Sequence, residues 1–216
     1  MTEKISFEDT CIVSCGTMKL EIDVLQEEGF LNVDRVFFAA PGLHEWPWKL
    51  AKQLSRLLKK ANEYTRNIVV VYGERCYMDS KNPMRVTQAL IDEASPRAIR
   101  IRATTCVDML ADASTRDDLA KGDKVWWCTP GWIKNWDFIF KDWDKGQANE
   151  MFPGYDKAVV LDGIGYFNRV MEESPEEILR ISDWMRLPIE SADISLDRFR
   201  ALLVVAAAET RKGAGE

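Results

Sequence analysis

The sequence predicts an α/β protein with an open, mostly parallel, doubly wound sheet that carries helices on both faces, as in Rossmann-like folds. Short apolar segments alternate with longer amphipathic segments in units of about 30 residues. The short segments are almost continuously apolar, which is typical of parallel strands buried on both faces. No Pro/Gly-rich linker divides the chain, so we expect a single domain over residues 1–216.

Six strands are expected, each followed by a helix. The strands span Thr10–Ser14, Arg35–Ala39, Asn67–Tyr72, Ala98–Arg102, Lys124–Trp127 and Lys157–Leu161. The helices span Thr17–Glu28, Pro47–Thr65, Pro83–Ala94, Val107–Ala113, Pro130–Trp143 and Phe167–Met185. Met18, Ile22 and Leu25 recur at helical spacing in the first helix, and Gly29 is a typical helix stop.

The later elements rest on similar local signals. Leu50 and Leu54 belong to one apolar stripe of the second helix. Ser174 followed by Pro175 has the pattern of a helix N-cap. After Asp193 the pattern fits a last helix, or a helix and a strand, that closes the sheet or mediates a dimer. The last residues, from about 211, are expected to be flexible.

Composition and charge exclude several classes of function. The chain is 46% hydrophobic and 30% charged, with a formal net charge of −6, which argues against a nucleic-acid-binding protein. No apolar run approaches the about 20 residues that a membrane-spanning helix needs. The segment Met1–Ser6 lacks the features of a signal peptide. We therefore expect a cytoplasmic protein whose thiols are reduced.

Cysteines carry the strongest functional signal. An odd, scattered set of five in a reducing compartment is a poor disulfide framework, which leaves buried thiols, metal ligands or a nucleophile. Four of the five follow predicted strands, as does the only histidine, whereas Cys11 lies within the first strand. These five residues are Cys15, His44, Cys76, Cys106 and Cys128. Because ligands of open parallel sheets bind beyond the carboxyl ends of the strands, we expect a site there.

Two kinds of metal centre suit this set of ligands. Cys15, Cys76 and Cys106 with His44 would make a tetrahedral zinc site. The three cysteines alone would hold an iron–sulfur cluster with one open iron. No Cys-x-x-Cys pair is present, and the alternative is that the thiols only fill the core. The carboxylates of Glu21 and Glu74 are candidate acid–base or orienting groups.

Tryptophan is abundant, with eight residues, and six of them lie near the predicted carboxyl ends of the strands. Trp46, Trp132 and Trp136 are candidates for the wall of a pocket that holds a planar ligand or a methylated ammonium group by cation–π attraction. The alternative is that Trp132 and Trp136, one helical turn apart, pack in the core.

Several short elements resemble a known prokaryotic family, the domain of unknown function sixteen thirty-eight. They are Cys15-Gly16 with Glu21, Leu43-His44 with Pro47 and Leu50, Tyr72-Gly73 leading to Cys76, Cys106 before a short helix, Thr129-Pro-Gly-Trp132 with Trp136, and Tyr155-Asp156. The resemblance covers roughly Cys11 to Leu187 and implies a cytosolic α/β protein, without supplying a reaction. Its association with corrinoid-dependent methyl-transfer systems implies corrinoid or methyltransferase proteins as partners.

Three hypotheses of function follow. The first is a metal- or iron–sulfur-binding protein whose cysteine site acts on a small molecule in one-carbon or methyl-transfer metabolism. The second is a non-catalytic accessory protein that binds a methylated amine, a corrinoid or a methyltransferase through the tryptophans. The third is a thiol enzyme with Cys76 or Cys106 as nucleophile and His44 as base. The oligomeric state stays open.

Overall fold

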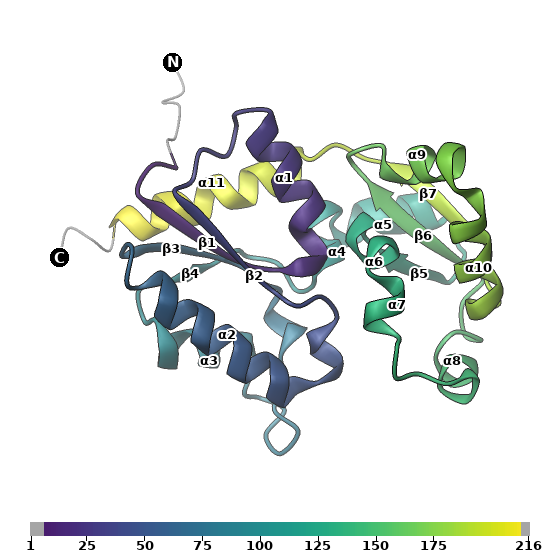
Figure 1. Cartoon of the computed structure of the whole chain (residues 1–216), viewed down its shortest axis with the longest axis horizontal. Helices are drawn as coiled ribbons and strands as arrows, with labels where there is room; N and C mark the ends of the chain where they lie inside the picture. Colours follow the sequence, from purple (N-terminus) through teal and green to yellow (C-terminus); the bar gives the residue numbers. More distant parts are fainter. Residues whose placement is uncertain (1–6, 213–216) are drawn as a thin grey trace.

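The computed structural model describes residues 7–212, without the side chains of Lys145, Ala148 and Asn149. It confirms the predicted class, since all strands are parallel within their sheets and helices surround them (Figure 1). Most of the end that was predicted to be flexible, from about residue 211, falls outside the described residues. Within residues 7–212, no helix is both long and apolar enough to cross a membrane.

A four-stranded sheet forms the first region of the molecule, in the order β2-β1-β3-β4. Its strands span Thr10–Cys15 (β1), Arg35–Ala39 (β2), Asn67–Val71 (β3) and Ile99–Arg100 (β4). The helices that cover it span Lys19–Glu27 (α1), Pro47–Ala61 (α2), Thr87–Ala94 (α3) and Asp197–Lys212 (α11). Ile12 packs with α1 and α11 on one face, whereas its neighbour Val13 packs with α2 and α3 on the other, because successive strand residues alternate between faces (Figure 1).

A three-stranded sheet forms the second region, in the order β5-β6-β7. Its strands span Val125–Cys128 (β5), Lys157–Asp162 (β6) and Ile189–Asp193 (β7). Its helices span Pro130–Lys134 (α6), Trp136–Ile139 (α7), Lys145–Met151 (α8), Tyr166–Glu173 (α9) and Pro175–Met185 (α10). The core between them is a cluster of aromatic rings, in which Trp136 and Phe140 lie 4.3 Å apart between ring centroids.

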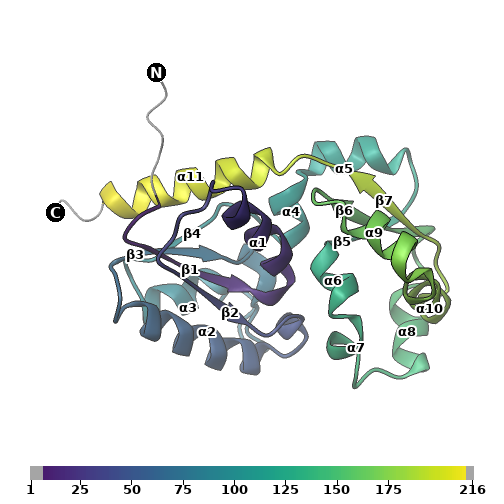
Figure 2. The ribbon, with the colours of Figure 1, turned by 45° about the horizontal axis from the view of Figure 1, so that its top comes forward.

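The two regions meet at a close backbone contact. A 3-10 helix, Gly16–Met18 (η1), follows β1 and faces the start of α6. The Thr129 hydroxyl donates to the Thr17 carbonyl over 3.1 Å, and a Cβ atom at Gly131 would lie only 2.0 Å from that same oxygen. Glycine is therefore required at position 131 for this approach. After β7, α11 returns across the first sheet (Figure 2).

The structure differs from the sequence predictions in several elements. The strands lie in two sheets rather than one, and β7 was not predicted as a strand. The predicted helix 167–185 is divided at Ser174, whose backbone is not helical because Pro175 disfavours that conformation in the preceding residue. Similarly, Asn135 separates α6 from α7. The predicted helix 107–113 is replaced by Cys106–Leu110 (α4) and Ala113–Ala120 (α5), because Asp112 caps a new helix.

Candidate functional site

A small enclosed cavity lies where the carboxyl end of the first sheet meets the second region. Its volume is about 20 Å³, which is room for about one water molecule or ion. The polar and aromatic side chains around it are Cys15, Thr17, His44, Tyr72, Cys76, Cys106 and Trp132. The structure therefore brings together the three cysteines and the histidine that the sequence predicted as one site.

Two tight backbone approaches bring these cysteines together. At the end of β1, a Cβ atom at Gly16 would lie 2.8 Å from the Ala39 carbonyl of β2, so the turn that carries Cys15 runs close beside β2. A Cβ atom at Gly73 would lie 2.4 Å from the Thr104 carbonyl. The loop that carries Cys76 therefore touches the loop that carries Cys106.

The contact between the Cys76 and Cys106 loops is also a pair of backbone hydrogen bonds. The Glu74 amide donates to the Ala103 carbonyl over 2.9 Å, and the Arg75 amide donates to the Thr104 carbonyl over 3.1 Å. These bonds belong to a 3-10 helix, Glu74–Cys76 (η3), which follows β3. They fix the separation of the two thiols through the backbone.

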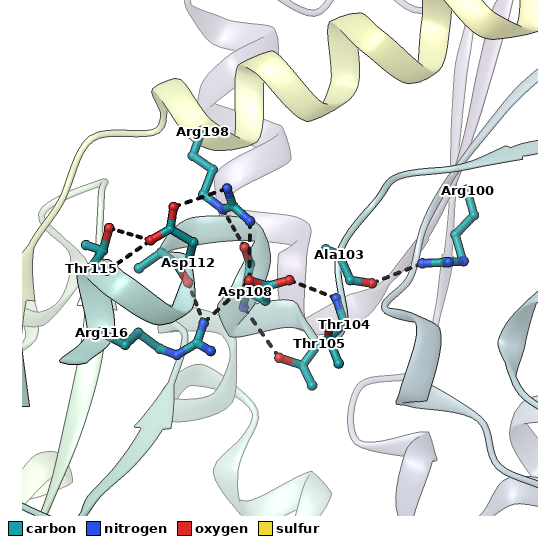
Figure 3. A network of polar contacts seen from close by, with 10 residues as sticks. Arg100, Ala103, Thr104, Thr105, Asp108, Asp112, Thr115, Arg116 and Arg198 are labelled. Carbon is teal, nitrogen blue, oxygen red and sulfur yellow. Dashed lines mark hydrogen bonds and ion pairs between the residues drawn. The ribbon is translucent and has the colours of Figure 1, made fainter. Parts of the chain in front are cut away.

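Asp108 fixes the loop that carries Cys106 through hydrogen bonds to its backbone and side chains (Figure 3). Its carboxylate accepts a 2.8 Å hydrogen bond from the Thr104 amide, and its own amide donates to the Thr105 hydroxyl, which caps α4. Arg198 of α11 donates to the Asp108 carbonyl over 2.7 Å and contacts its carboxylate at 3.3 Å. The last helix of the chain thus clamps the short helix that begins at Cys106.

Burial keeps two of the cavity thiols, Cys76 and Cys106, protonated. It raises the pKa of Cys106 to about 12, with a further contribution from Cys15, while a hydrogen bond from Trp132 acts in the opposite direction. Burial, followed by the neighbouring Cys106 and Cys15, raises the pKa of Cys76 even further. Arg100 lowers the pKa of Cys76 only in part, so both groups are thiols at neutral pH.

Two buried polar side chains at this end of the sheet have no hydrogen-bond partner among the described residues. They are the carboxylate of Glu21 on α1, of which both oxygens are unpartnered, and the hydroxyl of Tyr72, which lies beside the Cys15 thiol. Burial, and to a smaller extent Asp162, raises the pKa of Glu21 to about 8. Unpartnered buried polar atoms are rare in proteins, and each asks for an explanation.

Other predicted site residues are not brought to the cavity. Glu74 is exposed on η3. Trp136 is buried in the aromatic core of the second region, and Trp46 lies at the surface with the Lys49 ammonium 4.2 Å from its ring centroid. Only Trp132 lines the cavity, so the three tryptophans do not wall one pocket.

His44 lies between the cavity and the solvent. Its Nε2 atom is 3.2 Å from Glu45 Oε1, and its ring centroid is 5.2 Å from that of Trp132. The imidazole is thus placed to contact both a small molecule that enters and a group bound among the thiols.

The ligand geometry of a closed metal site is not preformed. Among residues 7–212, no three His, Cys, Asp or Glu side chains are close enough together to share one metal ion. The chemistry of the lining nevertheless suits a soft metal, because thiols and the thioethers of Met18 and Met109 surround the cavity. The ligand side chains would have to move closer together to close the site.

Sequence reasoning missed several lining residues, among them Tyr72, Met18 and Met109. Tyr72 ends a predicted strand, at the position that had already singled out the cysteines, so the same rule would have found it. Met18 and Met109 carried no signal of their own, because methionines at helical spacing are ordinary core residues.

The fold and the site define a parallel α/β protein with a thiol-lined cavity at the carboxyl edge of a sheet. Residues 38–203 match the model of a family described as proteins of unknown function, DUF1638, and the chain belongs to this family. It is the family that the short sequence elements resemble, and the match includes His44, Cys76 and Cys106. No curated protein and no solved structure matches the chain.

Proposed function

We propose that the chain binds a thiophilic metal through Cys15, Cys76 and Cys106 and presents it to a small molecule. The observation that carries the proposal is the convergence of these thiols, from three strand ends, around one cavity. His44 is the candidate for a fourth ligand or for a hydrogen-bond partner of the bound molecule.

The buried carboxyl group of Glu21, which interacts electrostatically with Cys106, supports a cation site. An unsatisfied buried polar group costs about 1–3 kcal/mol, so Glu21 would be unfavourable in a purely structural core. A positive charge in the cavity would lower the pKa values of Cys76 and Cys106, which are raised by burial. It would also favour the ionised form of Glu21.

The size of the cavity favours a single ion, such as zinc, over an iron–sulfur cluster. A volume of about 20 Å³ accommodates one atom-sized guest, whereas a cluster of several irons and sulfides needs considerably more room. A zinc ion with an open position would supply Lewis-acid polarisation of a bound molecule, or activation of a thiol.

The test is the metal content of protein purified without oxygen, together with its visible spectrum. We expect about one zinc per chain and no colour, and iron with sulfide and a broad visible band would instead indicate the cluster. The triple variant C15S/C76S/C106S should lose the metal. The control C128A removes a buried thiol outside the cavity lining and should keep it. Full metal content in the triple variant, or none in the wild type after reconstitution, would contradict the proposal.

The other two functional hypotheses have less support. A nucleophilic cysteine needs a depressed pKa, whereas burial raises the pKa values of Cys76 and Cys106. A ligand pocket walled by tryptophans would need Trp46 and Trp136 beside Trp132. The link to methyl transfer, with its corrinoid contact and methyltransferase partners, rests on the family resemblance alone and stays a prediction.

A further inference from the structure

Helix α2 concentrates positive charge on one face in an otherwise acidic chain. It contains five basic residues and no acidic one, whereas the chain has a net charge of −6. The five are Lys49, Lys52, Arg56, Lys59 and Lys60. Their spacing places them on one side of the helix, opposite the buried leucines of the core.

These cations have no acidic partner within the described part of the chain. Lys52, Arg56 and Lys59 are exposed and make no ion pair there. Lys49 lies over the rings of Trp46 and Trp48, at 4.2 and 5.4 Å. A row of like charges on one helix face is unfavourable by itself, and an anionic surface would offset it.

The cations border a groove of about 1120 Å³ along α2 and α3. Its apolar side chains include Leu43, Ala51 and Leu90, and Trp48, which is 66% exposed, stands at one end. Leu43 also lines the cysteine cavity, so a partner in the groove would lie beside the entrance at His44. We call this feature the basic groove.

We propose that the basic groove is a docking site for an acidic amphipathic segment of a partner protein. The carboxylates of such a segment would meet Lys52, Arg56 and Lys59, and its apolar residues would meet Trp48 and the groove floor. A membrane surface fits less well, because the apolar face of α2 is already buried in the core.

The probe is a fluorescent amphipathic peptide of about 18 residues, long enough to run the length of α2, with glutamates along one stripe. Binding is followed by fluorescence anisotropy at physiological ionic strength. The exposed triple variant K52E/R56E/K59E should weaken binding by about tenfold to a hundredfold. The control R97E/K124E/K134E makes the same change in net charge away from the groove and should bind within about twofold of the wild type.

Two further measurements sharpen the test. Trp48→Ala should also weaken binding, and circular dichroism should show that all variants stay folded. The variant C15S/C76S/C106S should bind the peptide normally, so that failure of the metal proposal and failure of the docking proposal are distinguishable. Equal losses in both charge variants, no preference over a lysine-substituted peptide, or tighter binding to phosphatidylserine vesicles or duplex DNA would overturn the proposal.

Discussion

Two buried carboxylates, one in each region of the molecule, have opposite surroundings. Asp162, at the end of β6 in the second region, accepts hydrogen bonds from the amides of Ile164, Tyr166 and Phe167 at 2.7–3.1 Å. Glu21, on α1 in the first region, accepts none among the described residues. Asp162 therefore stabilises the turn into α9. Burial of Glu21 instead has a desolvation cost that no local hydrogen bond offsets.

The cores of the two regions show the same contrast. The second region is filled by aromatic rings that contact one another, and none of its described buried side-chain polar atoms lacks a partner. The first region ends in thiols, an unpartnered tyrosine hydroxyl and a cavity. We infer that the second region supports the edge of the first, which carries the candidate site.

The largest expected effect is on stability, in the second region. Phe152 is fully buried, with the rings of Trp126 and Trp184 at 5.5 and 5.9 Å. Phe152→Ala should lower the free energy of unfolding by about 3–5 kcal/mol, because it leaves a cavity among packed rings. In the first region, Tyr72→Phe removes only a hydroxyl that lies beside the Cys15 thiol, and it should change stability by less than about 1 kcal/mol. Urea denaturation of both variants measures the difference, and similar losses would remove the contrast between the regions.

The next effect is a dependence on pH that originates at Glu21. Its pKa of about 8 in the folded protein exceeds the ordinary value of 4.5, so the folded state retains a proton that the unfolded state loses between these pH values. Stability should therefore fall as pH rises through this window, by about 2.5 kcal/mol between pH 5 and pH 7, and level off above about pH 8.

Glu21→Gln should abolish this pH dependence. Glu176→Gln is the matched control, because it makes the same charge change at an exposed position of α10 and should keep the slope. Denaturation is measured at several pH values on protein treated with a chelator, since a bound cation would change the ionisation of Glu21. A wild-type slope that persists in Glu21→Gln would show that another group is responsible.

A smaller effect is expected at the clamp on the Cys106 loop. Arg198→Ala removes the donor to the Asp108 carbonyl and should cost about 1–2 kcal/mol, since Arg198 is partly exposed. Cys106 should then react severalfold faster with iodoacetamide, as measured by mass spectrometry of its peptide. Arg102→Ala is the control: Arg102 pairs with Glu209 at 2.6 Å but is 75% exposed, so its loss should change neither quantity. An unchanged alkylation rate in Arg198→Ala would mean that the clamp does not position Cys106.

Sequence patterns predicted much of the fold because its signals are local. Continuous apolar runs marked β1, β2, β3, β5 and β6 to within about two residues. Strand β7 was missed because Ile189–Asp193 is only half-buried and interrupted by polar residues. The split into two sheets depends on contacts between distant segments, such as Gly131 against Thr17, which no local pattern encodes.

The candidate site was predictable as far as topology determines it. Parallel strands bring their carboxyl ends to one edge, and this rule alone assembled Cys15, Cys76 and Cys106. The rule does not say which side chains turn inwards, so it could not separate Trp132, which lines the cavity, from Trp136, which is in the core. Nor could it show that Glu21 lacks a partner, since this depends on every neighbour in three dimensions.

The smallest effect is expected at Trp132, where the two regions meet. Its ring belongs to the aromatic cluster, 5.6 Å from that of Trp126, and its indole N–H lowers the pKa of Cys106. Trp132→Phe keeps an aromatic ring but removes the donor, so the pKa of Cys106 should rise. A smaller fraction of Cys106 would then be thiolate, and alkylation should be slower by a few-fold at pH 9. The packing change should cost about 1 kcal/mol. Faster alkylation would show instead that the ring only blocks access to the thiol. The second region would then shield the site without changing the pKa of Cys106.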